Sequence, residues 1–481
     1  ENFMKKILIC NRGEIAIRVA KAVRELGHIA VGFYTDSEPE ASHLEYCHEW
    51  VHLKGSSNTE TYLNIEQIIE IVKTHRIDAV HPGYGFLSEN TEFCKRLEEL
   101  GTTFIGPHSE AIHKMGDKAV SKQMAKEAGV PVVPGSTGEI ESAEEAASIA
   151  KDIGYPVLLK AVAGGGGKGM RVVNSENELS NSFDAVRREA LSSFGNPGVL
   201  VEKFIVNPHH IEVQIIADNK GNVFHCFERE CSIQRRHQKI VEEAPSPFIG
   251  DDEELRLNVC NTAIKLAKAV NYNSAGTVEF IMGEDKSFYF LEMNTRIQVE
   301  HPITEEVTGI DLLVNMIKSA LGETLDFKSQ EEITIKGHAI ECRICAEDPI
   351  TMLPAPGQVN GFEFTFPQGI RFDHCIYNGL EVKSDFDPMI GKLIAYGHNR
   401  NVVIRKLDNA LEGLIIEGLK TNIPLHKVIM KENNFKSGHY TTNYIAEVSP
   451  QEGVEETKKV ESLFKKAIAI EMKALQEGRE R

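Results

Sequence analysis

The first 117 residues alternate short apolar segments with segments of helical periodicity, and this alternation limits the possible fold most strongly. After the apolar segment KKILIC, Ile15, Val19, Ala22 and Leu26 recur at the spacing of one helix face. Strands separated by helices favour a parallel α/β layer. No GxGxxG follows the first strand, which argues against a strict dinucleotide-binding fold. The predicted strands are KKILIC, HIAVGFY, AVHPGYGF with its glycine turn, and TTFIGP, and a further helix is predicted over LNIEQIIEIVKTHRID.

The rest of the chain divides into further units, because 481 residues are too many for one compact core. Val460, Phe464, Ile468 and Leu475 share one helix face and predict an amphipathic helix near the C-terminus, after a linker at SPQEGVEE. We expect an N-terminal α/β domain at 1–117, a second domain at 118–330 with a small lid at about 132–205, a mixed α+β domain at 331–448, and a linker with a helical tail at 449–481.

Charge and composition exclude several classes of protein. The formal net charge of −18 argues against nucleic acid as the main partner. No apolar run approaches the length of a membrane span, and no signal peptide precedes Met4. The nine scattered cysteines are typical of reduced thiols. We therefore expect a cytoplasmic protein that contacts neither nucleic acid nor membrane.

The stretch KAVAGGGGKGM, residues 160–170, predicts a phosphate-binding turn. Consecutive glycines expose backbone N–H groups, and Lys160 and Lys168 add two cations, which suits a polyphosphate such as ATP. The stretch is not a Walker A loop, because Gly169 follows Lys168 and Val162 occupies the place of the required early glycine. A flexible surface hairpin is the alternative.

Two glutamates interrupt the apolar segments AGTVEFIM and SFYFLEMN, which GEDK joins as a predicted hairpin. With a four-residue turn, Glu279 would face Phe290, and Glu292 would be its diagonal neighbour on the same face. Carboxylates so placed repel each other unless a cation lies between them, and hard oxygen ligands favour Mg²⁺. A solvated glutamate pair is the alternative.

The following stretch, LEMNTRIQVEHP, places polar residues at even positions. If the backbone is extended, these side chains share one face, and Arg296 near Glu300 would keep Glu300 ionised and able to accept a proton. Periodicity alone favours a half-exposed strand instead. The even set consists of Glu292, Asn294, Arg296, Gln298 and Glu300.

A basic cluster lies in ECSIQRRHQKIVEEAP. If this stretch is extended, Arg235, His237 and Lys239 lie on one face, and Gln234 lies off it. A solvated charge run balanced by Glu242 and Glu243 explains the same residues equally well.

Together these motifs resemble biotin carboxylase, an ATP-grasp enzyme. The resemblance rests on GGGGKGM, VEF with LEMN, SIQRRHQK and EMNTRIQVEHP, together with CNRGEIAIR, HPGYGFLSEN, FIGP, MGDK and ECRICAEDP, and it runs from about residue 4 to 445. It implies a mixed α/β protein with an N-terminal Rossmann-like domain, an ATP-grasp domain with a mobile lid, and a C-terminal α+β domain. It also implies a reaction in which bicarbonate attacks the γ-phosphate of MgATP, and the resulting carboxyphosphate supplies CO₂ to biotin.

The resemblance also implies roles for individual residues. Glu300 would be the base that deprotonates bicarbonate, and Arg343 would stabilise the biotin enolate. Gln234 matches the family motif but ranks lower, because it is expected off the face of Lys239. Lys239, Arg296, Gln298 and the Val299 backbone would hold bicarbonate, Glu279, Glu292 and Asn294 would bind Mg²⁺ or Mn²⁺, and ATP would contact Lys118, Lys160, Gly165, Gly166, Gly167, Met170, Glu202, Lys203, Ile205, His210, Gln234, His237, Glu279 and Glu292.

The resemblance further implies partners. EMKAL resembles a biotinylation site, but Lys473 lies in a predicted helix, whereas that site belongs on a β-hairpin, so we expect biotin on a separate carrier protein. A homodimer is also implied, as is a partner carboxyltransferase. The acyl acceptor, whether acetyl-CoA, pyruvate or propionyl-CoA, stays open. The competing hypotheses are another ATP-grasp ligase and a non-catalytic protein that binds ATP.

Overall fold

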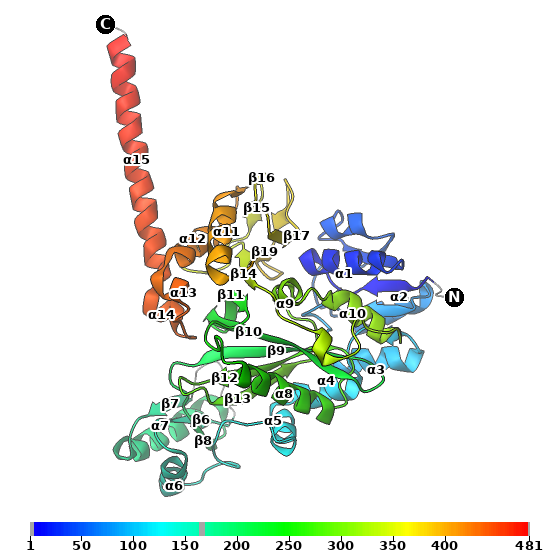
Figure 1. Cartoon of the computed structure of the whole chain (residues 1–481), viewed down its shortest axis with the longest axis vertical. Coiled ribbons are helices and arrows are strands. Elements are labelled where there is room, and N and C mark those ends of the chain that lie inside the picture. The colour runs from blue at the N-terminus through cyan, green and yellow to red at the C-terminus, as the bar shows by residue number, and fades with distance from the viewer. Residues whose placement is uncertain (1–3, 163–168, 480–481) are drawn as a thin grey trace.

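The computed structural model describes residues 4–162 and 169–479 and begins with a five-stranded parallel sheet, as the alternating pattern predicts (Figure 1). The strand order is β3-β2-β1-β4-β5. The edge strand β3 was not predicted, because its sequence EWVHL carries charged and aromatic residues, and Trp50 lies exposed. The elements are β1 (Lys6–Ile9), α1 (Gly13–Glu25), β2 (Ile29–Thr35), η1 (Ser42–Tyr46), β3 (Glu49–Leu53), α2 (Ile65–Thr74), β4 (Ala79–His81), α3 (Thr91–Leu100), β5 (Thr103–Phe104) and α4 (Ser109–Gly116).

An eight-stranded sheet forms the centre of the molecule, in the order β13-β12-β9-β10-β11-β14-β19-β17. Its neighbouring strands pair antiparallel, and β11 pairs with β14, so the sheet continues without a break across the expected boundary at residue 330. Helix α8 packs on β10 and β9, and α9 lies against β14. The elements up to this boundary are α5 (Lys118–Glu127), β9 (His209–Ala217), β10 (Val223–Arg235), β11 (Gln238–Ala244), α8 (Glu253–Ala269), β12 (Ala275–Met282), β13 (Phe288–Asn294), α9 (His301–Thr308), α10 (Leu312–Ala320) and η2 (Gln330–Glu332).

A small separate layer lies between α5 and β9 in the sequence. Its three strands pair in the order β7-β6-β8, and two helices pack on them. Leu159, Phe183 and Val201 belong to a hydrophobic core distinct from that of the central sheet. The elements are α6 (Ala143–Ile153), β6 (Val157–Ala161), β7 (Met170–Val173), α7 (Glu176–Phe194) and β8 (Val199–Lys203).

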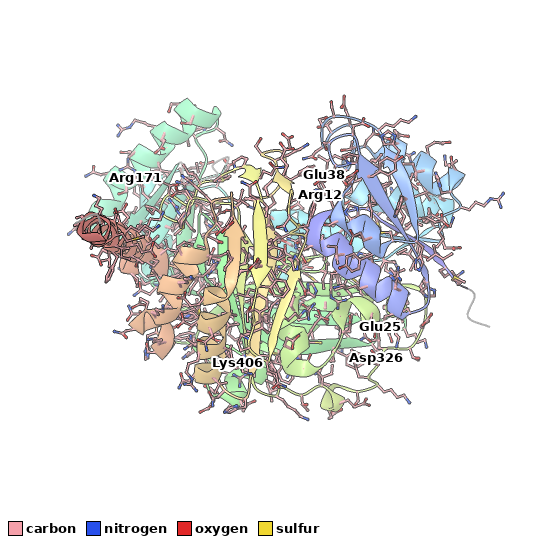
Figure 2. All side chains as sticks on the ribbon, turned by 90° about the horizontal axis from the view of Figure 1, so that it is seen from above. Arg12, Glu25, Glu38, Arg171, Asp326 and Lys406 are labelled. Atoms are coloured by element: carbon pink, nitrogen blue, oxygen red, sulfur yellow. The ribbon has the colours of Figure 1, made fainter. Side chains whose placement is uncertain are left out.

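The C-terminal part adds three strands to the central sheet and covers them with helices. Helix α11 packs on β19 and β14, and α12 packs on α11. Phe386 from this part contacts the guanidinium of Arg12, whose carboxylate partner is Glu38, so the C-terminal part meets the N-terminal domain there (Figure 2). The elements are β14 (His338–Cys345), β15 (Gly357–Gln358), β16 (Gly361–Phe364), β17 (Ile370–His374), β18 (Glu381–Val382), β19 (Met389–Gly397), α11 (Arg400–Glu412), β20 (Leu414–Glu417), α12 (Ile423–Lys431), α13 (Asn433–Ser437) and α14 (Tyr444–Val448).

The chain ends in one long helix, α15 (Pro450–Arg479), which projects from the body of the molecule (Figure 1). The expected linker at 449–456 is wrong, because the helix already begins at Pro450, a residue favoured in a first helical turn. Val454 is buried and anchors the base of α15, which packs on α12, whereas Val460, Phe464 and Ile468 are exposed. Within the described ranges, no helix combines the length and the apolar character that crossing a membrane requires.

Candidate functional site

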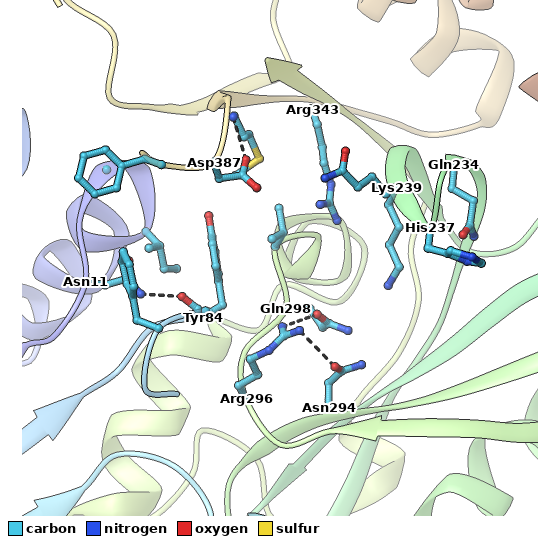
Figure 3. A pocket seen from close by; sticks show the side chains of 18 of the residues that line it. Asn11, Tyr84, Gln234, His237, Lys239, Asn294, Arg296, Gln298, Arg343 and Asp387 are labelled. Atoms are coloured by element: carbon cyan, nitrogen blue, oxygen red, sulfur yellow. Dashed lines mark hydrogen bonds between the residues drawn. The ribbon is translucent and has the colours of Figure 1, made fainter. Parts of the chain in front are cut away.

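A cavity of about 930 Å³ opens where the N-terminal domain, the central sheet and the C-terminal part meet (Figure 3). Asn11 and Tyr84 come from the N-terminal domain, and Arg343 and Asp387 come from the C-terminal part. Most of the residues expected at a site line this one cavity: Lys118, Met170, His210, Gln234, His237, Lys239, Glu279, Glu292, Asn294, Arg296, Gln298, Val299 and Arg343.

Lys239 lies at the centre of the charged groups. Its Nζ donates to Glu212 Oε2 at 2.7 Å, Glu279 Oε1 at 2.9 Å and Glu300 Oε1 at 2.6 Å. Burial lowers the pKa of Lys239, but the three carboxylates outweigh burial and raise it well above its usual value. All three N–H bonds of the ammonium are therefore engaged, and Lys239 holds carboxylates from three separate segments together.

The hairpin between β10 and β11 brings Lys239 to the cavity. Arg236 and His237 have positive φ angles of 51° and 65° and form a tight turn, so the stretch is not extended throughout. Gln234 pairs directly with Lys239 across the hairpin and lines the same cavity. The lower rank given to Gln234 is therefore wrong, because the turn reverses the chain and restores both side chains to one face. Arg235 lines a second, neighbouring cavity instead.

The predicted hairpin of β12 and β13 is present, but its register differs from the expected one. The turn spans residues 283–287, and an irregularity between Glu279 and Phe280 leaves Leu291 unpaired. As a result Glu279 faces Glu292 directly instead of Phe290. Burial and the charge of Glu279 raise the pKa of Glu292. Two oxygen ligands that repel each other in this way fit a divalent cation such as Mg²⁺.

Asn294 and Gln298 complete the surroundings of Glu279. Their amide nitrogens donate to Glu279 Oε1 at 2.8 and 3.0 Å. His210 Nε2 lies 3.2 Å from Glu279 Oε2, and His210, Glu212 and Glu279 form a compact group of potential metal ligands. Burial lowers the pKa of His210, but Glu279 and Glu212 together outweigh burial and raise the pKa to about 9.

The segment after β13 is not an extended strand. The strand ends at Asn294, and an irregular loop leads into α9, for which Glu300 is the N-cap residue and Pro302 lies in the first turn. The loop nevertheless gathers its polar groups. Arg296 Nη1 donates to Gln298 Oε1 at 2.6 Å, and its Nη2 donates to Asn294 Oδ1 at 3.1 Å (Figure 3).

Glu300 is completely buried, and it forms ion pairs with side chains other than the expected Arg296. Arg296 pairs with Glu89 at 3.1 Å, whereas Glu300 contacts Lys239 at 2.6 Å and Arg343 Nη2 at 2.9 Å. Burial and Glu212 raise the pKa of Glu300, but Lys239, Arg343 and Arg229 outweigh them, so the pKa lies below its usual value. Glu300 is therefore ionised near neutral pH.

Several expected ATP contacts lie outside the cavity lining. Lys160 and Glu202 belong to β6 and β8, where their side chains form an ion pair of 2.8 Å. Lys203 donates to the carbonyls of Gly154 and Tyr155, which places it within the small layer of β6, β7 and β8. Ile205 follows β8 and does not line the cavity. Gly165, Gly166 and Gly167 lie outside the described residues.

Three contributors were missed at the sequence level. Glu212 is fully buried and contacts both Lys239 and Arg229, and its signal was a charged residue within the apolar strand HHIEVQIIA. Arg229 was hidden in the same way within β10. Tyr84 lines the cavity and donates to Glu14, and its signal was an aromatic residue inside a glycine turn.

Comparisons with known proteins agree over nearly the whole chain. Family models match at residues 3–112 (biotin carboxylase, N-terminal domain), 117–328 (carbamoyl-phosphate synthase L chain, ATP-binding domain) and 341–447 (biotin carboxylase C-terminal domain). The chain is 47% identical to biotin carboxylase 1 of Bacillus subtilis over 92% of its length and 98% of the relative. It is also 46% identical to the biotin carboxylase of Pseudomonas aeruginosa, covering 92% of this chain and 98% of that one.

A solved structure gives the same result for the fold. The biotin carboxylase domain dimer of the Hydrogenobacter thermophilus 2-oxoglutarate carboxylase, in complex with MgADP, ADP and bicarbonate, superimposes with a TM-score of 0.83. It is 46% identical, and the match covers 94% of this chain and 99% of that one.

Proposed function

Because the chain belongs to the biotin carboxylase family, whose members use ATP and Mg²⁺ to carboxylate biotin, we propose that this reaction takes place in the cavity around Lys239. The predicted mixed α/β ATP-grasp fold and the predicted biotin carboxylase activity are thereby confirmed. The roles of individual residues are our proposal.

We assign the metal to the facing pair Glu279 and Glu292, with Asn294 beside them. A divalent ion held there would neutralise charge on the nucleotide phosphates. Around this pair, Lys118, His210, Gln234, His237 and Met170 line the nucleotide side of the cavity. Lys160, Glu202, Lys203 and Ile205, with Gly165–Gly167, are assigned to the same nucleotide from the lid.

We assign bicarbonate to the loop that carries Arg296, Gln298 and Val299, next to Glu300. Glu300 accepts the proton of bicarbonate, so that an oxygen of bicarbonate can attack the γ-phosphate of ATP. Bicarbonate and phosphate are both anions, and the Arg296 and Lys239 cations reduce their repulsion. Arg343, which contacts the Glu300 oxygen that Lys239 does not contact, is assigned to stabilise the biotin enolate.

A single observation carries this assignment: Glu300 is a fully buried carboxylate held ionised between Lys239 and Arg343, which both line the cavity, whereas Glu300 lies just behind that lining. A base must be ionised before the reaction, and this arrangement meets that requirement at neutral pH. The test is ADP release from ATP by the purified chain. It should require both bicarbonate and biotin, and ADP release that ignores biotin and needs another acceptor would contradict the assignment.

The relatives include subunits and domains of larger biotin-dependent carboxylases. We propose that this chain likewise forms a homodimer and acts with a separate biotin carrier protein and a carboxyltransferase. The exposed apolar side chains of α15 support a partner contact there. Affinity capture with the full chain and with a chain ending at residue 448 tests this, because only the full chain should retain the carboxyltransferase.

We also propose a cytoplasmic location. All nine cysteines are unpaired and buried, which is typical of a reducing compartment. Localisation of a tagged chain by fluorescence in its host checks this.

A further inference from the structure

The segment 295–300, to which bicarbonate is assigned and which is called the bicarbonate loop below, contacts two buried residues that do not line the cavity. His301 Nδ1 contacts the carbonyl oxygen of Gln298 at 2.7 Å. Lys392, from β19 of the C-terminal part, donates from Nζ to the carbonyl oxygen of Val299 at 2.8 Å. Because a carbonyl oxygen only accepts, His301 Nδ1 carries the proton in this contact. Two successive peptide units of the loop are therefore fixed by residues that lie outside the cavity lining.

Peptide geometry converts these contacts into an orientation of donors. In a trans peptide, the C=O of one residue and the N–H of the next point in opposite directions. The carbonyl of Gln298 points to His301, so the N–H of Val299 points away from it. The same argument applies to the carbonyl of Val299 and the N–H of Glu300. Within residues 4–162 and 169–479, neither N–H donates a hydrogen bond.

The anchor on Lys392 joins all three parts of the chain. Lys392 is fully buried, and its Nζ also lies 3.3 Å from Glu14 Oε1, on α1 of the N-terminal domain. Glu14 in turn accepts from Tyr84, which lines the cavity. A buried lysine is costly unless it is paired, so the contact with Glu14 keeps the ammonium in place to hold Val299.

From these contacts we propose that His301 and Lys392 are positioning residues for bicarbonate: they fix the Gln298–Val299 and Val299–Glu300 peptides so that the N–H of Val299 faces the anion. Neither residue touches the substrate. The proposal rests on the assignment of bicarbonate to this loop, and it adds residues that act through the backbone instead of through a side chain at the site.

The two ends of an imidazole can be separated by substitution. Asn places an amide nitrogen near the position of Nδ1, whereas Gln places one near Nε2. We expect His301→Gln to raise the KM for bicarbonate about three- to tenfold, the factor expected when one orienting hydrogen bond is lost. His301→Asn keeps a donor at the Nδ1 position, so its KM for bicarbonate should stay close to that of the unsubstituted chain. The KM for ATP should stay unchanged in both. His43→Asn is the control, because His43 contacts the carbonyl oxygen of Phe33 at 2.7 Å through Nε2, which Asn does not reach, so this variant also removes a buried imidazole–carbonyl contact but does so away from the cavity.

Lys392 needs a paired design, because Lys392→Met leaves Glu14 buried without a cation. The double variant Lys392→Met with Glu14→Gln removes both charges and keeps an acceptor for Tyr84. We expect this variant to be folded, by thermal unfolding, and to show a raised KM for bicarbonate with an unchanged KM for ATP. If the double variant does not fold, the His301 pair alone decides the proposal.

The outcomes also separate this proposal from the bicarbonate assignment. Arg296→Met should raise the KM for bicarbonate, and if it does not, bicarbonate binds elsewhere and both ideas fail. If Arg296→Met raises it while His301→Gln leaves it within twofold of the unsubstituted chain, the positioning role is wrong and the assignment stands. Equal changes in the KM for ATP and for bicarbonate would also overturn the positioning role, because they indicate a general structural effect.

Discussion

Glu300→Gln tests the chemistry most directly, because it replaces an ionised oxygen by an amide of the same shape. Glu300 is fully buried, and its two carboxylate oxygens contact Lys239 at 2.6 Å and Arg343 at 2.9 Å. The amide cannot accept the proton of bicarbonate. General-base catalysis contributes about 10²- to 10⁴-fold, so we expect kcat for ADP release to fall by about that factor.

The structure also predicts that the substituted protein stays folded. Lys239 keeps Glu212 at 2.7 Å and Glu279 at 2.9 Å, and Arg343 keeps its contact with Glu242. Neither cation is left without a carboxylate, so the usual large penalty for breaking a buried ion pair does not apply in full. The melting temperature should therefore change far less than the rate.

Glu341→Gln is the matched control for this experiment. Glu341 is an equally buried glutamate on β14, but neither of its oxygens has a hydrogen-bond partner among the described residues, and it does not line the cavity. Burial raises the pKa of Glu341 well above its usual value, which favours the neutral form that the amide resembles. ADP release is measured with saturating ATP, bicarbonate and biotin. Turnover of Glu300→Gln within threefold of the unsubstituted chain would refute the role of Glu300 as the base.

Three further predictions concern the metal, the acid stability and the tail. Glu292→Gln should raise the Mg²⁺ concentration for half-maximal ADP release at least about tenfold, since it removes one of two facing carboxylates; an unchanged Mg²⁺ titration would exclude Glu292 as a ligand. Burial raises the pKa of Glu243, but Arg400 and His338 outweigh it and lower the pKa to about 2. Because the pKa of Glu243 is lower in the folded protein than its unfolded value near 4.5, Glu243 stabilises the fold at pH values above 4.5, and this contribution is lost as the pH falls towards 2. Glu243→Gln should therefore lower the free energy of unfolding by about 3 kcal/mol at pH 7 and make that free energy depend less on pH in acid. Urea unfolding at pH 7 and pH 4 measures both effects, and parallel stability–pH curves would argue against the assignment. Val454→Ala should remove about 1–2 kcal/mol of packing between α15 and α12 and speed amide hydrogen exchange in α15; exchange rates like those of the unsubstituted chain would show that Val454 does not anchor the helix.

The fold could be predicted well from the sequence, because strand and helix periodicities are local. The parallel N-terminal layer follows from apolar segments such as KKILIC, each of which is short and followed by a helix. The strand β3 escaped prediction because its half-exposed sequence has no such apolar run. The base of α15 escaped because turn-forming residues such as Ser449 and Pro450 precede Val454, whose burial depends on α12.

The site was predicted by residue type but not by geometry. Type I′ turns are usually recognised by Asn-Gly or Asp-Gly, and Arg236-His237 carries no such signal, so the pairing of Gln234 with Lys239 was hidden. The unpaired Leu291 shifts Glu292 against Glu279 in a way that counting turn residues does not reveal. The contact between Arg343 and Glu300 joins two distant parts of the chain, and local periodicity carries no information on such contacts.

The long helix α15 has a consequence for the size of the particle in solution. Its 30 residues extend about 45 Å at 1.5 Å per residue. A compact chain of 481 residues has a radius of gyration of about 23 Å, so this single helix matches roughly two such radii. The longest dimension measured by small-angle X-ray scattering is therefore set largely by α15, which lines no part of the cavity. Removing α15 should shorten the particle and leave its hydrophobic core largely intact.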